Sequence, residues 1–198
     1  MISKKAEDLI LLFEGFDVPW RWPGESSGIT IGRGYDLGYE PFTRDWNGLL
    51  SASDFERLRK TVGLVGNNAA RVAPSLRGIN IPVAIADQVF GNVTLPRYEQ
   101  QTLHAFPNSD KLPEDAFGAL VSIVFNRGAA LAGDRRREML AIHKLLLNSD
   151  PKSPDTLKQI AALVRSMARL WPDRKDSDND LHDRRMREAE LIEGALGR

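Results

Sequence analysis

Residues 13–38 read FEGFDVPWRWPGESSGITIGRGYDLG, and here the chain changes from a helical pattern to a glycine-rich ribbon. The apolar residues just before this change recur at helical spacing: Ile2, Ala6, Leu9, Ile10 and Phe13. We therefore predict a helix over residues 3–14. Ser3 is suited to cap its start, and Gly15 is suited to end it in a left-handed conformation.

The second half of the stretch predicts a small β-structure. Residues 28–32 (GITIG) alternate small or polar residues with apolar ones, which is typical of a short strand. Gly32, Gly34 and Gly38 indicate a hairpin or bulged ribbon with close backbone approaches. From residue 51 onward the patterns are mainly helical.

The sequence therefore predicts an α+β fold that is predominantly helical. We expect one domain over residues 1–198, with a small β-ribbon lobe over about residues 15–50. A helical lobe covers about residues 51–198, and the helix over residues 3–14 lies beside a cleft.

Composition excludes several classes of function. Lys plus Arg and Asp plus Glu each number 27, and this zero net charge argues against unselective binding to nucleic acid or anionic membrane. The absence of cysteine excludes disulfides, zinc thiolates and thiol nucleophiles. His104, His143 and His182 lack metal-ligand spacing, so we expect neither a metal nor another cofactor.

Glu14 is the strongest candidate for acid chemistry. It closes the first helix among apolar neighbours: Ile10, Leu11, Phe13 and Phe16. Apolar surroundings and the negative end of the helix both favour the protonated form of a carboxyl group. Those conditions suit a proton donor, although most glutamates at helix ends are simply solvated.

Two sequence motifs favour the proton donor over the solvated glutamate as the interpretation of Glu14. Leu-Phe-Glu-Gly-Phe at 12–16 followed by Gly-Ile-Thr-Ile-Gly-Arg-Gly-Tyr-Asp-Leu-Gly at 28–38 resembles the phage-type lysozyme superfamily, and within it the pesticin-like bacterial or phage muramidases. Residues 119–128 (ALVSIVFNRG) are similar to the core helix of that family. Residues 133–136, 170–171 and 184–189 also fit this branch.

The resemblance implies a lysozyme-like fold and a muramidase. Such an enzyme hydrolyses the β-1,4 bond between N-acetylmuramic acid and N-acetylglucosamine in peptidoglycan. Glu14 then matches the catalytic acid, and Thr30 matches the threonine that orients the attacking water. Members are generally inverting, which requires two carboxyl groups ~6.5–9.5 Å apart.

The second carboxylate has two candidates. Asp36 lies six residues after Thr30, as in the pesticin-like pattern, and we prefer it. Glu25 is the alternative, because the commoner family pattern has an acid just before the ribbon. An unbroken strand would put Thr30 and Asp36 on one face. We interpret Asp17 as a loop residue that makes local hydrogen bonds.

Several further residues are candidates for substrate binding. Trp20, Trp22 and Tyr35 either line a glycan cleft or close the core of the small lobe. Asn126 and Arg127 lie near the cleft according to the resemblance, or else make structural hydrogen bonds. The run at 135–137 is either a solvated helix start or a contact for acidic peptide stems.

The expected partner is the glycan strand of peptidoglycan, bound by a monomer without nucleic acid or stable membrane insertion. An immunity protein or a secretion machinery is a further candidate partner. No signal peptide is evident, so we expect synthesis in the cytoplasm and action in the periplasm, after release through membrane lesions or dedicated export. Two other functions stay open: a lytic transglycosylase, and a non-catalytic glycan-binding or toxin module.

Overall fold

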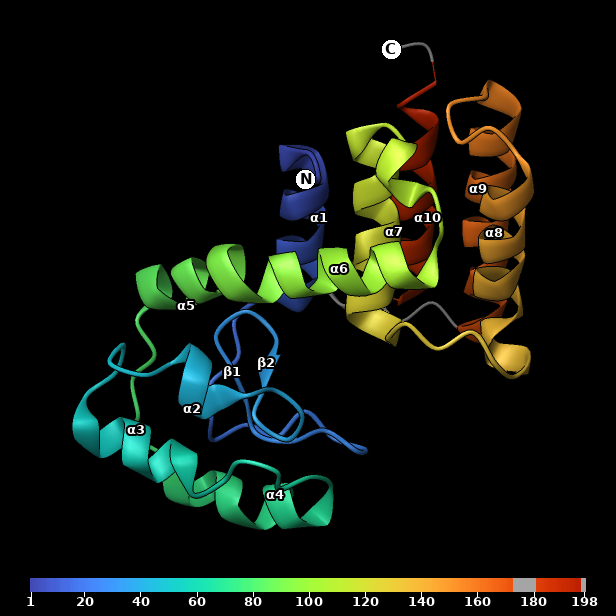
Figure 1. Cartoon of the computed structure of the whole chain (residues 1–198). Coiled ribbons are helices and arrows are strands. Elements are labelled where there is room, and N and C mark those ends of the chain that lie inside the picture. Colours follow the sequence, from blue (N-terminus) through green and yellow to red (C-terminus); the bar gives the residue numbers. More distant parts are fainter. Residues whose placement is uncertain (173–180, 197–198) are drawn as a thin grey trace. The chain divides into compact units, whose positions relative to one another are not determined.

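The computed structural model describes residues 1–172 and 181–196 (Figure 1). Within these residues the chain is predominantly helical, with one small antiparallel ribbon near the N-terminus. The predicted combination of much helix and little sheet is therefore confirmed.

The chain divides into two compact units. One comprises Met1–Phe13 with Arg97–Arg198, and the other comprises Glu14–Pro96. The second unit begins where the β-ribbon lobe was predicted to begin, but it ends at Pro96 rather than near residue 50. The reason is packing, because the ribbon and the helices over residues 51–89 share one hydrophobic core.

The Glu14–Pro96 unit combines the ribbon with short helices. Its elements are β1 (Thr30–Ile31), β2 (Tyr35–Asp36), α2 (Phe42–Asp45), α3 (Ala52–Arg59), α4 (Asn67–Val72), the 3-10 turn η1 (Ala73–Leu76), α5 (Val83–Val89) and the π turn η2 (Phe90–Thr94). Trp46 is at the centre of the core, edge-on to Tyr35 with ring centroids 5.6 Å apart and stacked on Phe42 at 6.3 Å. Such aromatic contacts fix the ribbon against α2.

The β-ribbon is shorter than the strand that the sequence predicts over residues 28–32. Thr30 pairs with Asp36 and Ile31 pairs with Tyr35 in antiparallel register. Gly32 and Gly34, in the turn between the strands, have φ values of 61° and 69°. This left-handed region is strained for residues with a Cβ, so these two glycines permit the tight turn.

A continuous helical run passes through Gly91 and Pro96, two residue types that usually interrupt a helix. The π turn η2 follows α5 directly, and α6 (Leu95–Ala105) follows η2. Pro96 has no N–H and its ring crowds the carbonyl four residues earlier, so an α-helical hydrogen bond cannot form there. The wider π turn accommodates this local conflict within the helix. Pro82 precedes α5 as its N-cap.

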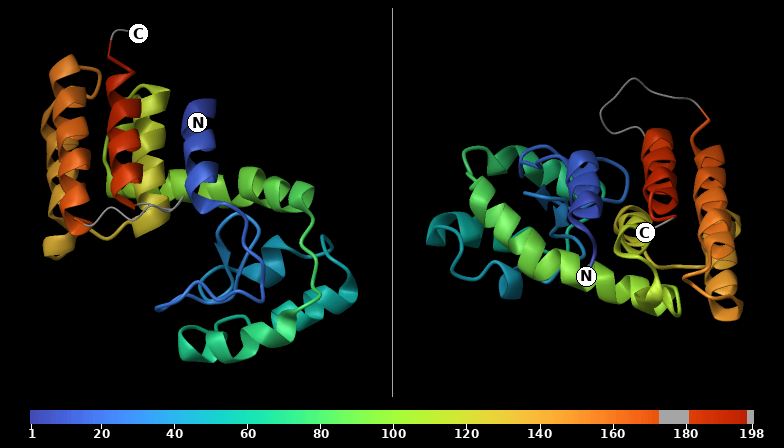
Figure 2. Two further views of the ribbon diagram at one scale, coloured as in Figure 1. Left: turned by 180° about the vertical axis from the view of Figure 1, so that it is seen from behind. Right: turned by 90° about the horizontal axis from the view of Figure 1, so that it is seen from above.

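The other unit is a helical assembly. Its elements are α1 (Lys4–Glu14, without its last residue), α6 from Arg97, the 3-10 turn η3 (Ser109–Lys111), α7 (Glu114–Arg127), the 3-10 turn η4 (Asp134–Arg136), α8 (Arg137–Asn148), α9 (Pro154–Ser166), the 3-10 turn η5 (Met167–Leu170) and α10 (Leu181–Glu193). Helix α10 packs against both α7 and α9, and Figure 2 shows these helices side by side. Helix α7 is buried along most of its length. Gly118 permits its close approach to α1, because a Cβ there would lie 2.2 Å from that of Ala6.

A buried polar network joins α7 to α10. Glu188 accepts hydrogen bonds at Oε1 from Ser122 Oγ at 2.6 Å and from Arg185 at 3.0 Å. Arg184 donates to the Ser122 carbonyl at 3.2 Å. All four side chains are almost fully buried. Charges in such surroundings need partners, so the network fixes how the two helices pack.

Candidate active site

Glu14 is the last residue of α1, as the sequence predicts. At the other end of the helix, Ser3 Oγ accepts the N–H of Ala6 at 3.2 Å, which confirms Ser3 as a cap. Gly15 has a φ of 60°, which confirms it as the residue that ends the helix. The Glu14 side chain is half-buried, and Glu14 lies at the point in the chain where α1 ends and the segment leading to the ribbon begins.

The chain just after Glu14 is hydrogen-bonded to the turn between the two strands of the ribbon. The Asp17 N–H donates to the Gly32 carbonyl at 2.7 Å, and the Gly32 N–H donates to the Asp17 carbonyl at 2.9 Å. The Arg33 guanidinium adds a bond to the Gly15 carbonyl at 2.8 Å and another to Asp87 Oδ1 at 2.8 Å. These bonds hold the end of α1 at the turn of the ribbon.

The ribbon presents Thr30 and Asp36 as a cross-strand pair. The chain turns between them, so the unbroken strand considered from sequence is not what joins them. They share a face nonetheless, because residues directly opposite in an antiparallel pair point to the same side. Thr30 is only 7% exposed.

The Asp36 carboxylate is fixed by backbone donors. Oδ1 accepts the N–H of Gly38 at 2.7 Å and that of Gly28 at 3.0 Å, and Oδ2 accepts the Gly28 N–H at 3.0 Å. Burial raises the pKa of Asp36, while these N–H donors lower it. Because a carboxylate offers about four acceptor positions, one on Oδ2 is left after these three bonds.

Asp17 belongs to the same electrostatic environment. Burial raises the pKa of Asp17 to about 6, and the charge of Glu14 acts in the same direction. A backbone hydrogen bond from Gly34 lowers it, and the charge of Asp36 raises it slightly further. The hydrogen bonds of Asp17 are thus made to Gly32 and Gly34 across the ribbon turn rather than locally, and its carboxyl also interacts with both predicted catalytic carboxyls. Nothing in its spacing from Glu14 indicated this second property, which depends on the chain turning back toward Gly32.

Glu25 lies in a different setting. Its side chain is exposed, and its φ of 51° places it in a tight turn. It is not among the charges that shift the pKa of Asp17, whereas Glu14 and Asp36 both are. The arrangement therefore favours Asp36 over Glu25 as the partner of Glu14, and the choice between them stays a prediction.

The aromatic candidates divide between core and surface. Tyr35 is 2% exposed, and its hydroxyl donates to Asp45 Oδ2 at 2.8 Å, so it belongs to the core. Trp22 packs against the same core, and its indole N–H donates to the Ser27 carbonyl at 2.9 Å. Trp20 is half-buried, and its contact with a sugar stays a prediction.

Asn126 and Arg127 end helix α7, in the helical unit. Asn126 Oδ1 accepts a bond from Arg185 at 3.3 Å. Arg127 donates to the Arg135 carbonyl, and its Cζ lies 5.4 Å from the ring centroid of Trp171. These contacts are of the structural kind considered from sequence, and a role for either residue in binding glycan stays a prediction.

Among the described residues there is neither a candidate metal-binding cluster nor a candidate membrane span. Among residues 1–172 and 181–196, no group of three or more His, Asp or Glu is placed to hold a metal ion. Over the same ranges, every helix is too short or too polar to serve as a membrane span.

Comparison with known proteins does not assign the chain to a family. No family model matches it, and no curated protein matches it significantly. A function for this chain is therefore argued from its own residues and their geometry.

Proposed function

We propose that this chain is a peptidoglycan hydrolase of the phage-type lysozyme superfamily, with a lysozyme-like fold. The reaction would be hydrolysis of the β-1,4 bond between N-acetylmuramic acid and N-acetylglucosamine, with inversion at the anomeric carbon. The motifs around Glu14 and Thr30 suggest this activity, and the way the structure joins these two motifs supports it.

The observation that carries the proposal is the pair of backbone hydrogen bonds between Asp17 and Gly32. Within the Glu14–Pro96 unit, these bonds join the segment that begins at Glu14 to the ribbon that bears Thr30 and Asp36. An inverting glycosidase needs an acid on one side of the scissile bond and a base on the other. A helix end held against a β-ribbon provides carboxyl groups from two separate elements for these roles.

In the proposed mechanism, Glu14 donates its proton to the glycosidic oxygen as the bond to the anomeric carbon breaks. A water molecule attacks that carbon from the opposite face, and Asp36 accepts the proton that the water loses. The acceptor position left on Asp36 Oδ2 is suited to this water, and the Thr30 hydroxyl orients it by a hydrogen bond.

Asp17 adds a third acid to this proposal. Because its pKa is raised to about 6, it is mostly protonated in mildly acidic conditions and charged above pH 6. We assign Asp17 the role of a positioning residue, whose backbone hydrogen bonds to Gly32 hold the segment after Glu14 on the ribbon.

The biological setting is part of the proposal. The partner is the peptidoglycan glycan strand, and the protein acts as a monomer. The proposed site of action is the bacterial cell wall, reached by release through membrane lesions or by a dedicated export machine. An immunity protein would be needed where the producing cell is itself exposed.

The test uses purified peptidoglycan with the wild-type chain and the Glu14→Gln variant. Glu7→Gln is the matched control, because Glu7 lies on the same helix and its ion-pair partner Lys4 is 71% exposed. We expect wild type and the control to release reducing-end products, identified by mass spectrometry. Loss of the acid should lower the rate about 10²- to 10⁴-fold.

Other outcomes would point to the alternative functions. Anhydro ends on the product sugars would identify a lytic transglycosylase, and pelleting with peptidoglycan without any cleavage would identify a non-catalytic binding or toxin module. Full activity of Glu14→Gln would remove Glu14 from the mechanism.

A further inference from the structure

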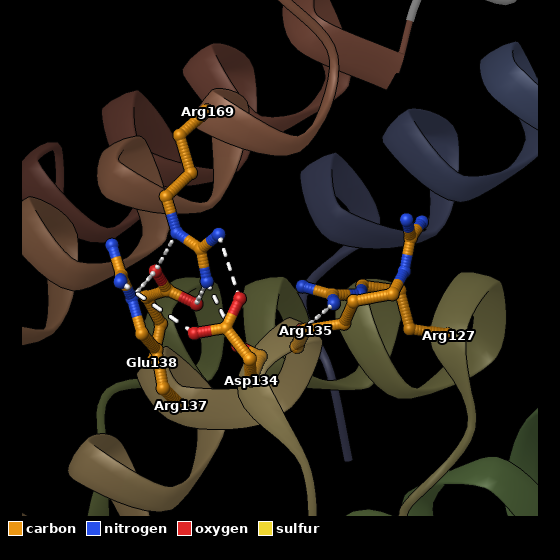
Figure 3. Close-up of polar contacts among 6 residues, drawn as sticks. All are labelled: Arg127, Asp134, Arg135, Arg137, Glu138 and Arg169. Carbon is orange, nitrogen blue, oxygen red and sulfur yellow. Dashed lines mark hydrogen bonds and ion pairs between the residues drawn. The ribbon is translucent and has the colours of Figure 1, made fainter.

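The segment from Asp134 to Glu138 contains two acids whose charges are compensated. Arg169 Nε donates to Glu138 Oε1 at 2.6 Å, and Arg137 Nε donates to the same oxygen at 2.9 Å. Arg169 Nη1 lies 3.4 Å from Asp134 Oδ2, and Arg137 also lies within ion-pair distance of Asp134, at 3.7 Å. Figure 3 shows the two arginines on these two carboxylates. Each of these two acids is therefore already in ion-pair contact with two arginines.

Three arginines beside this cluster have a different environment. Arg127 donates to the Arg135 carbonyl, as the dashed line in Figure 3 marks, and Arg136 donates to the Arg127 carbonyl. Within the described part of the chain, none of these three guanidinium groups lies within ion-pair distance of a carboxylate. Their hydrogen-bond acceptors are neutral: two backbone carbonyls and the Met139 sulfur.

The mutual effect of these cations shows that they are close together. Burial lowers the pKa of Arg127 to about 10, the positive charges of Arg136 and Arg135 act in the same direction, and the negative charges of Glu138 and Glu188 oppose them. Burial also lowers the pKa of Arg136, again with a contribution from the charge of Arg135. The three side chains thus form a concentration of positive charge that the protein itself compensates only weakly.

Arg127 also has an unused donor. Its Nη1 is buried and has no hydrogen-bond partner within the described residues. The centroid of the Trp171 ring lies 5.4 Å from Arg127 Cζ and 5.9 Å from Arg185 Cζ. A buried N–H without an acceptor is unfavourable, and a ligand oxygen placed there would satisfy it.

We propose that Arg127, Arg135 and Arg136 form a binding site for an oxyanion carried by a ligand. Guanidinium groups present several N–H donors in a planar fork, which suits the oxygens of a carboxylate or phosphate group. Such an oxyanion would offset the repulsion among the three cations and accept the unused N–H of Arg127. The site lies in the helical unit, and the inference holds whether or not the chain is a muramidase.

The experiment measures binding of inorganic phosphate and, separately, of glutarate to the full chain by calorimetry. Chloride keeps the ionic strength constant, so that general screening does not change during the titration. The variants are Arg127→Gln and Arg135→Gln. Arg137→Gln is the matched control, because it removes the same charge from a neighbouring arginine that is already paired with acids.

We expect saturable binding of at least one anion by the wild type and by Arg137→Gln. Arg127→Gln and Arg135→Gln should weaken it about tenfold or more, since each loses charge-assisted hydrogen bonds. Binding of phosphate alone would identify a phosphate-bearing ligand, and binding of glutarate alone would identify a carboxylate such as that of an acidic peptide.

Two results would overturn the proposal. One is the absence of saturable binding of either anion by a folded wild-type chain. The other is equal weakening by Arg135→Gln and Arg137→Gln, because binding would then follow net charge rather than this site. Arg135 is exposed, so its variant should fold even if Arg127→Gln does not. Thermal stabilisation of the wild type by the bound anion gives a second measurement.

Discussion

Thr30 and Asp36 lie directly opposite each other across the β1–β2 ribbon. In this register the Asp36 carboxylate also accepts the backbone N–H groups of Gly28 and Gly38. One side chain therefore ties the two ends of the ribbon together and lies beside the threonine of the proposed site. An Asp36 variant can therefore lose activity because the ribbon is destabilised or because the proposed base is missing. A measurement of stability distinguishes these two causes.

Asp36→Asn should reduce both stability and peptidoglycan hydrolysis. An amide oxygen in the place of Oδ1 can still accept both N–H groups, but the NH₂ group then faces the Gly28 N–H where the acceptor Oδ2 was. We expect the free energy of unfolding in urea to fall by about 1–3 kcal/mol. Hydrolysis at a temperature where the variant is folded should fall about 10²-fold or more.

Glu25→Gln is the comparison for Asp36→Asn, since Glu25 is exposed in a turn. It should change neither the unfolding curve nor the rate of hydrolysis. If Glu25→Gln abolishes hydrolysis while folded Asp36→Asn retains it, then the second carboxylate is Glu25 and our preference is wrong.

Arg33→Gln should lower the rate of hydrolysis strongly and change the melting temperature only slightly. Arg33 connects Gly15, at the end of α1, to Asp87 on α5, and its guanidinium lies 5.4 Å from the Phe16 ring centroid. Loosening the end of α1 moves Glu14 relative to the ribbon, and displacements of this kind lower rates by about 10- to 100-fold. The measurement is kcat on soluble glycan fragments, beside the melting temperature.

Arg59→Gln is the control for Arg33→Gln, because Arg59 forms an exposed pair with Glu56. It should leave kcat and the melting temperature close to wild type. An Arg33→Gln variant with unchanged kcat would show that these contacts do not position the acid.

Gly28→Ala should destabilise the Glu14–Pro96 unit. A Cβ at residue 28 would lie 2.3 Å from Asp36 Oδ1 and 2.5 Å from the Gly38 nitrogen, so the ribbon must shift to accept it. Forced insertion of this kind lowers the free energy of unfolding by about 1–3 kcal/mol. Gly91→Ala is the matched control, since its Cβ meets nothing within 4 Å and should be neutral or slightly stabilising. Equal unfolding curves for the two variants would contradict the packing argument.

The sequence predicted local structure well where one residue type dictates it. The helix ending at Glu14, the glycine that terminates it and the buried helix α7 all follow from capping chemistry and periodicity. The π turn before Pro96 was not predicted, because proline in a helical pattern usually indicates a break. Here a wider turn of the helix absorbs the lost hydrogen bond.

Long-range properties of the candidate site were harder to predict. The Asp17–Gly32 bridge joins residues fifteen positions apart, and no local pattern indicates it. The boundary near residue 50 differed from the observed division because the shared core depends on contacts between distant segments. Tyr35 looked equally suited to a glycan cleft and to a core, and only its burial distinguishes the two.

Asp17 makes the stability of the protein depend on pH in a direction that its replacement can test. Its pKa is raised from 3.8 to about 6 in the folded chain, chiefly by burial. Between these values the folded state binds more protons than the unfolded state, so stability falls as the pH rises toward 6 and then levels off.

Asp17→Asn mimics the protonated form and avoids this loss. Relative to wild type, it should therefore be stabilised at pH 7 by on the order of 1–3 kcal/mol and little changed at pH 3.5. Urea unfolding at both pH values measures the difference, with Asp8→Asn, an exposed acid on α1, as the control. A gain in stability of Asp17→Asn that is the same at both pH values would show that Asp17 does not titrate as described.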